Sequence, residues 1–240
     1  MDIARTRIDP GRNPLLAALP PEERELLEPG LEPVELTLKL TLEEPGRPIA
    51  HIWFPSHGVA SMVAEMADGS MVEVATIGRE GFVGLPLILD APATANRTFV
   101  QIPGKGDRIP SAAFKALLPR LPALHRLMLR YTLTVVTQIA QGSACNRLHP
   151  IEARCARWLL MTHDRVDGDV FPLTHEFLSV MLGVTRPSVS IAAGMLQRAG
   201  LVRYARGVVE VLDRPGLEAA SCECYQIITD SFRRLVGDEE

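Results

Sequence analysis

The sequence has no apolar run long enough to cross a membrane. A membrane-spanning helix needs about 18 consecutive apolar residues, and the 240 residues contain no such run. The N-terminal segment MDIARTRIDPGRNP also lacks the apolar core of a signal peptide. We therefore expect a cytoplasmic protein with no membrane partner.

Cysteine is scarce and confined to the C-terminal part of the chain. The four cysteines are Cys145, Cys155, Cys222 and Cys224. Their spacing fits neither a disulfide framework nor the paired CxxC pattern of a zinc site, and a single CxC pair is weak evidence for metal binding or redox activity. We expect buried or incidental thiols and no metal, and the role of Cys222 and Cys224 stays open.

Catalytic motifs are missing as well. The chain has no GxSxG, no GxxxxGK and no HExxH, which would carry a nucleophile, cradle a phosphate or hold a zinc ion. We therefore expect no enzymatic activity. The net charge of −4 argues against a wholly basic nucleic-acid coat, although it leaves room for a local basic patch.

What the sequence does contain is enough apolar residues, 47%, for real cores, and a length that favours two domains. Residues 15–28 predict a short helical lead-in. Residues 34–42 alternate apolar and polar and predict one half-buried strand. A second strand at 49–54, a hairpin turning at Asp68-Gly69, and strands at 98–102 and 107–109 follow, which together indicate an antiparallel barrel or sandwich.

From Ser111 the pattern is helical for some fifty residues. Heptad spacing from residue 121 predicts a dimer seam. The seam residues are Leu121, Leu124, Met128, Tyr131, Val135 and Gln138. A second apolar side, Leu129, Leu133, Val136 and Ala140, indicates that the helix buries two faces, one against its own barrel and one against something else. The alternative is a helix buried within its own domain.

A break at residues 146–150 marks a candidate domain boundary, and a helix at 151–162 follows. The segment LGVTRPSVSIAAGMLQRAGLV then predicts two short helices around Gly183, with Thr174 and Thr185 as N-caps. This is a helix-turn-helix pattern. Two β-rich runs around Arg206-Gly207 predict a small hairpin, or wing.

Charge supports a nucleic-acid partner for this segment. Residues 177–209 contain four arginines and no Asp or Glu, in a chain whose acids outnumber its bases. A surface that faces phosphates needs such an absence of carboxylates, because each carboxylate subtracts from the affinity that cations supply. The pattern therefore favours DNA binding.

The order of these parts resembles the Crp/Fnr family of bacterial transcription regulators over nearly the whole chain. The most specific match is LTHEFLSVMLGVTRPSVSIAAGMLQRAGLVRYARGVVEVLD with the following LEAASCECY, and a looser one is GREGFVG, LPLIL and RTFVQIPG. The resemblance implies an α+β fold: an antiparallel β-barrel of the cyclic-nucleotide-binding or jelly-roll type at residues 1–120, a long dimerisation helix and hinge at 121–148, and a winged helix-turn-helix at 149–240. It implies a homodimer on a pseudo-palindromic double-stranded DNA site, with RNA polymerase as a further partner.

Carried over by position, Arg186 falls on the family's usual base-reading arginine, which can fork onto guanine. Pro187 and Ile191 depart from the glutamate and second arginine of the cyclic-AMP receptor protein, so a different target sequence is expected. Further candidates for DNA contacts are Thr174, Thr185, Ser188, Ser190, Arg203 and Arg206.

The family's effector pocket is degenerate here. Gly84, Leu85 and Pro86 stand where a Gly-Glu pair holds a ribose, Arg97-Thr98 stands for the phosphate-binding pair, and Ile139 and Ala140 replace the hydroxyls that meet adenine. The effector is therefore unknown, and we expect one other than cyclic AMP or none at all.

We predict no cofactor. An iron–sulfur cluster of the kind some relatives carry needs thiolates near the N-terminus, where this chain has none. His51, His57 and His125 could in principle supply an axial ligand to haem, but lone histidines are more often ordinary polar residues. The alternative function is a ligand- or protein-interaction module that keeps the architecture but has lost specific DNA recognition.

Overall fold

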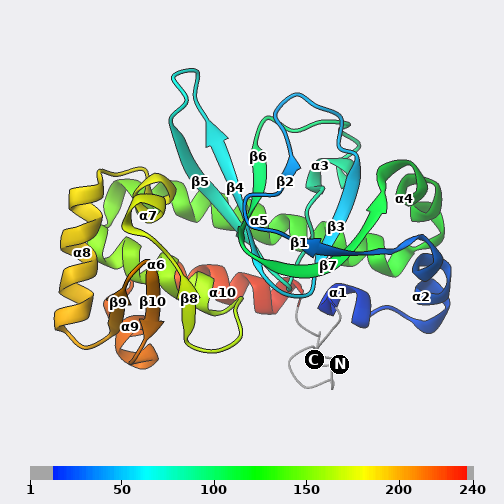
Figure 1. The fold of residues 1–240 in the computed structure, drawn as a ribbon. Coiled ribbons are helices and arrows are strands. Elements are labelled where there is room, and N and C mark those ends of the chain that lie inside the picture. The colour runs from blue at the N-terminus through cyan, green and yellow to red at the C-terminus, as the bar shows by residue number, and fades with distance from the viewer. Residues whose placement is uncertain (1–12, 237–240) are drawn as a thin grey trace.

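The computed structural model describes residues 13–236 (Figure 1), so most of the segment considered as a signal peptide lies outside the described residues. The chain begins with two short helices, α1 (Pro14–Ala17) and α2 (Pro21–Leu27). A proline occupies the first turn of each, where its missing N–H costs nothing. The side chain of Asn13 caps α1 by accepting a hydrogen bond from the backbone N–H of Leu15 at 2.9 Å.

Seven strands form the N-terminal barrel in two antiparallel sheets. The first sheet has the order β1-β7-β3 and the second β2-β6-β4-β5. The strands are β1 (Glu32–Leu36), β2 (Thr41–Glu43), β3 (His51–Pro55), β4 (Val59–Glu65), β5 (Met71–Ile77), β6 (Arg97–Ile102) and β7 (Gly104–Pro110). The predicted α+β class with an antiparallel N-terminal barrel is confirmed.

Two local predictions in the barrel are wrong. The alternating segment 34–42 is not one strand, because the chain turns between β1 and β2 with Lys39 at a φ of 65°, and Leu38 is left exposed. The β4–β5 hairpin does not turn on Asp68-Gly69 as its central pair. Its turn runs from Met66 to Gly69, where the Gly69 N–H donates to the Met66 carbonyl at 2.9 Å and glycine takes the positive φ of 82°.

After the short helices α3 (Leu85–Ile88) and α4 (Ser111–Leu117) comes the long helix α5 (Pro122–Leu148). Its 27 residues extend for about 40 Å. The predicted dimer seam is wrong in its choice of face, because Leu121, Leu124, Met128, Tyr131 and Val135 are at most 2% exposed and belong to the barrel's own core. Gln138 is buried as well. The side left open carries Leu129, Leu133 and Val136.

The C-terminal part packs helices around a three-stranded sheet of order β8-β10-β9. Its elements are α6 (Ile151–His163), β8 (Val170–Pro172), α7 (His175–Leu182), α8 (Arg186–Arg198), β9 (Val202–Ala205), β10 (Val208–Val211), α9 (Arg214–Ala220) and α10 (Cys224–Leu235). Strand β8 was not expected from the turn-like sequence around it. The final helix α10 returns along α5, and its Phe232 and Leu235 pack on the barrel core (Figure 1).

Within residues 13–236 no single helix is both long and apolar enough to span a membrane, and only the bent pair α7 and α8 together passes a test of length and composition.

Candidate functional site: the helix-turn-helix and its contact with the barrel

The corner between α7 and α8 is built by local capping residues. The Thr174 hydroxyl accepts from the Phe177 N–H at 3.1 Å and starts α7. Gly183 ends α7 at a φ of 62°, a left-handed conformation that favours glycine. The two helices meet at 108°, within the range typical of helix-turn-helix units. The predicted helix-turn-helix is therefore confirmed.

Helix α8 has one buried stripe and one open face. Thr185 caps the helix by accepting from the Ser188 N–H at 3.4 Å, and Pro187 lies in the first turn. The buried stripe is the predicted one, Val189, Ala192, Ala193 and Leu196. Arg186 and Ile191 lie on the open face, and the Ile191 side chain is 62% exposed. An exposed isoleucine beside an exposed arginine presents an apolar and a charged contact on the same surface.

In the structure Arg186 lies near an acidic residue, Glu176, that falls just outside the acid-free range of residues 177–209. Arg186 Nε lies 3.8 Å from a Glu176 carboxylate oxygen, and both side chains are mostly exposed. Such a pair contributes little, about 0–1 kcal/mol. The same helix face holds Ser190, whose hydroxyl lies 3.1 Å from Nδ1 of His175. Arg186 is thus weakly held and free to exchange Glu176 for another acceptor.

The hairpin of β9 and β10 forms the predicted wing. Arg206 and Gly207 are its two turn residues, with φ of 50° and 79°, as a two-residue type I′ turn requires. Arg203 forms an ion pair with Glu210 on the neighbouring strand. Residues 177–209 contain no acids, but the folded surface that they form does have acids beside it. Glu176 and Glu210, which flank this range in the sequence, lie next to two of its four arginines.

The helix-turn-helix unit packs against the outer side of the barrel. Val59, Val63 and Ile102 of the barrel share one core cluster with residues of α6 to α8. The Trp158 indole N–H donates to Glu73 at 2.8 Å, and the Arg165 guanidinium donates to Glu80 at 2.8 Å. Burial raises the pKa of the Glu73 carboxyl, while its hydrogen bonds oppose that shift. Polar and apolar contacts therefore both join the two parts.

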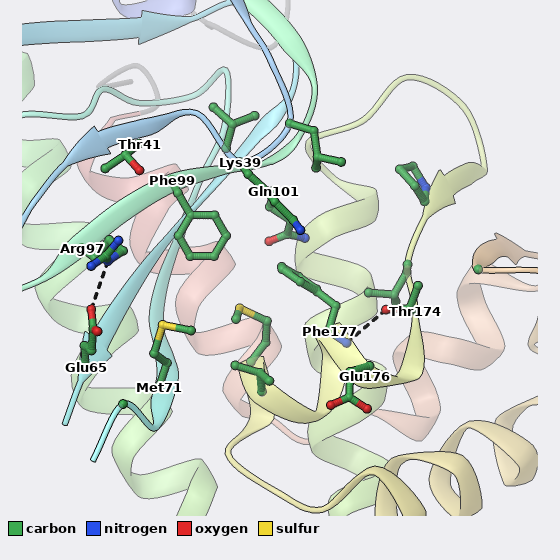
Figure 2. A pocket seen from close by; sticks show the side chains of 18 residues that line it. Lys39, Thr41, Glu65, Met71, Arg97, Phe99, Gln101, Thr174, Glu176 and Phe177 are labelled. Carbon is green, nitrogen blue, oxygen red and sulfur yellow. Dashed lines mark hydrogen bonds and ion pairs between the residues drawn. The ribbon is translucent and has the colours of Figure 1, made fainter. Parts of the chain in front are cut away.

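A cavity of about 710 Å³ lies between β6 and α7 (Figure 2). Phe99 and Phe177 approach one another edge to face across it, with ring centroids 6.4 Å apart. Arg97 and Glu65 pair at its edge at 3.0 Å. Its lining is mostly apolar with a few charged groups, as is typical of small-molecule sites.

The residues of the expected effector pocket do not all face this cavity. Arg97 lines it, but Thr98 is buried and donates to Glu43 at 2.6 Å. Leu85 is buried in the barrel core, where it follows Gly84 with its φ of 117°. The remaining positions lie on short α3 and on α5: Pro86, Ile139 and Ala140, of which Ala140 is exposed.

Three of the four cysteines gather at a place that sequence spacing did not indicate. Cys145 lies in the last turn of α5, and Cys222 and Cys224 lie where α10 begins. Cys145 and Cys222 are 77 positions apart in the chain, yet their sulfurs are 3.5 Å apart. His149 joins them from the segment between α5 and α6. These are soft ligand atoms suited to a metal ion such as zinc.

Comparisons with known proteins agree with this architecture. Residues 153–220 match the family model of the Crp-like helix-turn-helix domain. No curated protein sequence matches the chain. Among solved structures, a protein assigned to the Crp/Fnr family of transcriptional regulators from Eubacterium rectale superposes with a TM-score of 0.67 at 16% identity, covering 86% of this chain and 97% of that one. FixK2 from Bradyrhizobium japonicum gives 0.69 at 14% identity, covering 80% and 98%. TTHB099, a CRP-family transcriptional regulator from Thermus thermophilus, gives 0.62 at 19%, covering 78% and 96%.

Proposed function

We propose that the chain is a transcriptional regulator of the Crp/Fnr type, as its fold and its Crp-like helix-turn-helix domain support, and that it binds a pseudo-palindromic DNA site as a homodimer. Each copy inserts α8 into a major groove, and the two grooves lie about 34 Å apart on one side of the duplex. Such a partner places the protein in the cytoplasm, and RNA polymerase is the second macromolecule it meets there.

The observation that carries the proposal is the open face of α8. Arg186 stands at its N-terminal end, where recognition helices contact base edges. Its guanidinium can donate to O6 and N7 of one guanine, a contact that discriminates by about 1–3 kcal/mol. Ile191 follows on the same face and suits a thymine methyl group. The two together predict that each half-site contains a guanine and a thymine.

Phosphate contacts surround these two readers. The hydroxyls of Thr185, Ser188 and Ser190 lie along the first turns of α8, and the N-terminal end of the helix dipole adds a partial positive charge. Thr174 caps α7, and Pro187 shapes the first turn of α8 without donating a hydrogen bond. The wing residues Arg203 and Arg206 add contacts to the phosphates that position the helix without reading the base sequence.

The homodimer uses the open side of α5. Leu129, Leu133, Val136 and Ala140 follow each other at spacings of four, three and four residues. This alternation is the repeat of a two-helix seam. All four are exposed in the single chain, with the opposite side of the helix already buried in the barrel. A second copy of α5 is the partner that matches this pattern.

The effector, where one acts, is not cyclic AMP. Leu85 is buried in the core and offers no carboxylate to a ribose, and Thr98 is engaged with Glu43. The cavity beside Phe99 and Phe177 is a better place for control, because its walls come from both the barrel and α7. A ligand that binds there changes the contact between the two parts.

Selection of bound duplexes from a random pool tests the DNA-binding proposal, followed by gel-shift titration of cognate and scrambled duplexes. We expect two half-sites one helical turn apart. Arg186→Ala should remove most of the preference for cognate DNA, a loss of about 5- to 150-fold for each half-site, because the bidentate contact is lost in both copies. Arg198→Ala is the matched control, since this exposed arginine lies at the other end of α8.

Two outcomes would contradict the assignment. Cognate preference that survives Arg186→Ala intact shows that α8 does not read bases as described. Binding that falls steeply with salt but shows no sequence preference supports instead an interaction module that has lost specific recognition.

A further inference from the structure

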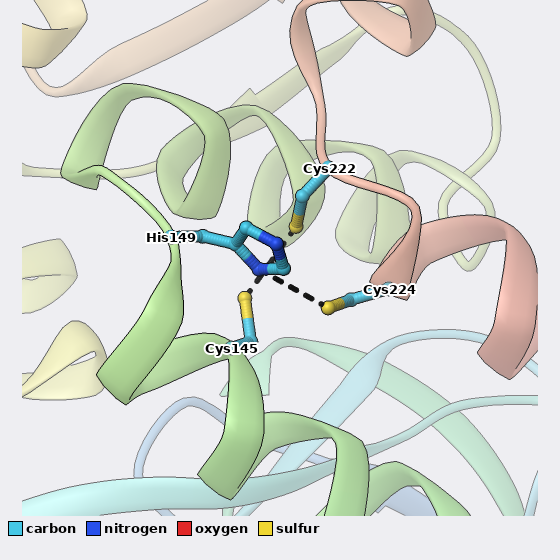
Figure 3. Close-up of side chains that lie close together, drawn as sticks. All are labelled: Cys145, His149, Cys222 and Cys224. Atoms are coloured by element: carbon cyan, nitrogen blue, oxygen red, sulfur yellow. Dashed lines mark hydrogen bonds between the residues drawn. The ribbon is translucent and has the colours of Figure 1, made fainter.

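We propose a closed zinc site that binds one ion through four ligands: Sγ of Cys145, Cys222 and Cys224 and Nδ1 of His149 (Figure 3). The site lies where the last turn of α5, the segment before α6 and the start of α10 meet. It is independent of DNA recognition.

The ligand atoms have the separations that zinc requires. All four lie within 4.8 Å of one another. Cys145 Sγ and Cys222 Sγ are 3.5 Å apart, and Cys224 Sγ lies 3.4 Å from His149 Nδ1. Around a tetrahedral zinc ion, with Zn–S of about 2.3 Å and Zn–N of about 2.0–2.1 Å, two sulfurs lie about 3.8 Å apart and a sulfur and a nitrogen about 3.6 Å apart. One small ion therefore fits with minor adjustment.

The ligand set indicates one zinc ion in particular. Three thiolates and one imidazole form a recognised structural zinc set, with no position left for water or substrate. Hard ions such as Mg²⁺ and Ca²⁺ prefer oxygen ligands, which none of the four provides. An iron–sulfur cluster needs its ligands spread over more than one iron, whereas these atoms converge on a single point.

Outer contacts hold the ligands in place. The other ring nitrogen of His149, Nε2, lies 3.3 Å from a Glu223 carboxylate oxygen, which leaves Nδ1 to face the sulfurs. A carboxylate behind a ligating histidine is typical of zinc sites and fixes the ring. The Gln141 side-chain N–H donates to Cys224 Sγ at 3.2 Å, which supports that atom as a thiolate.

Charge in the surroundings fits as well. Three thiolates around a divalent ion leave one net negative charge. Arg154, on α6, is buried; burial lowers the pKa of its guanidinium, and Cys145 and Cys222 oppose that shift. The positive charge of Arg154 therefore acts on Cys145 and Cys222 and offsets part of the remaining negative charge.

The concentration of cysteine at this point argues against coincidence. The chain has four cysteines, and three of them meet here from two distant segments. The fourth, Cys155, is buried on α6 outside the group, and burial raises the pKa of its thiol to about 12. A thiol of that kind is inert, so Cys155 serves as the internal control.

The site fastens the end of the chain to the junction between its two parts. Two ligands come from α5 and the residues after it, and two from the start of α10. Helix α10 continues along α5, and its Phe232 joins the barrel core. Zinc therefore stabilises the position of α10 and, through it, the position of the C-terminal part against α5.

The test uses the full chain, purified under reducing conditions and loaded with zinc alone. Elemental analysis should find one zinc ion per chain, and cobalt(II) in its place should show the absorption of tetrahedral thiolate coordination. Cys224→Ala should weaken zinc binding at least about 100-fold, beyond the loss expected for an outer contact. Cys155→Ala should keep full occupancy. Chelation should lower the thermal midpoint of the wild type and leave that of Cys224→Ala unchanged.

A gentler variant keeps the test decisive if Cys224→Ala does not fold. Glu223→Gln leaves all four ligands in place and should weaken zinc binding about 10- to 100-fold by removing the carboxylate behind His149. Three results would overturn the proposal: a reduced chain that takes up no zinc, purified protein with iron and labile sulfide in place of zinc, or zinc bound equally well by wild type and Cys224→Ala. A Cys145–Cys222 disulfide in a chain that takes up no zinc after reduction assigns the cluster to redox chemistry instead.

Discussion

Leu133→Asp tests the open side of α5 as the dimer interface. The exposed fractions of Leu129, Leu133 and Val136 are 41%, 51% and 53%, which together amount to about one and a half whole side chains. At about 2 kcal/mol for each fully buried aliphatic side chain, covering them stabilises the dimer by about 3 kcal/mol for each copy, or about 6 kcal/mol in all. Leu133 supplies about one third of that.

The aspartate therefore removes about 2 kcal/mol of apolar burial from the dimer, since both copies change. It also places two carboxylates opposite each other at the seam, which costs more because they lose water on association. We expect the dimer dissociation constant to rise by at least about 30-fold, measured by analytical ultracentrifugation across a dilution series. Affinity for a two-half-site duplex should fall with it, while affinity for a single half-site should change little.

Leu89→Asp is the matched control, because Leu89 follows α3 on the barrel and is 60% exposed. It should leave both the dimer and DNA binding unchanged. A Leu133→Asp protein that dimerises like wild type refutes the assignment of this face. If Leu89→Asp disrupts the dimer instead, the interface lies on the barrel.

Two further predictions follow from carboxylates that the fold brings to the helix-turn-helix. Glu176→Gln should raise affinity for cognate DNA by up to about fivefold, because Arg186 then binds DNA without first breaking its exposed ion pair, which is worth at most about 1 kcal/mol. A gel-shift titration against wild type measures the change. An affinity below that of wild type would show that Glu176 positions Arg186. Glu73→Gln tests how the stability of the fold depends on pH. Because the pKa of Glu73 is raised in the folded state, the contribution of Glu73 to the free energy of unfolding is fully present below the ordinary pKa of 4.5. It is lost as the pH rises through the folded-state pKa. The thermal midpoint of wild type minus that of Glu73→Gln should therefore decrease from pH 4.5 towards neutrality, and a difference that stays constant would rule out a raised pKa.

Local chemistry explains why the helix-turn-helix and the wing were predictable. Thr174 and Thr185 cap helices and Gly183 forms a left-handed turn, and each of these interactions involves only residues a few positions away. Such local effects can be predicted from the sequence. The same is true of Arg206-Gly207, where the turn type follows from its two residues. The split between β1 and β2 was missed because alternation across 34–42 continues through a bend that other strands impose.

Local sequence patterns alone predicted an antiparallel barrel, one long helix and a winged helix-turn-helix, with Arg186 at the start of its second helix. Tertiary structure decided which face of α5 is free, because both faces are apolar and only packing against the barrel selects one. It also decided that Glu176 and Glu210 reach the arginines from outside their window. The tertiary structure also placed Cys145 and His149 next to Cys222 and Cys224. No local pattern relates residues so far apart in the sequence, and only the return of α10 along α5 places their ligand atoms around one point.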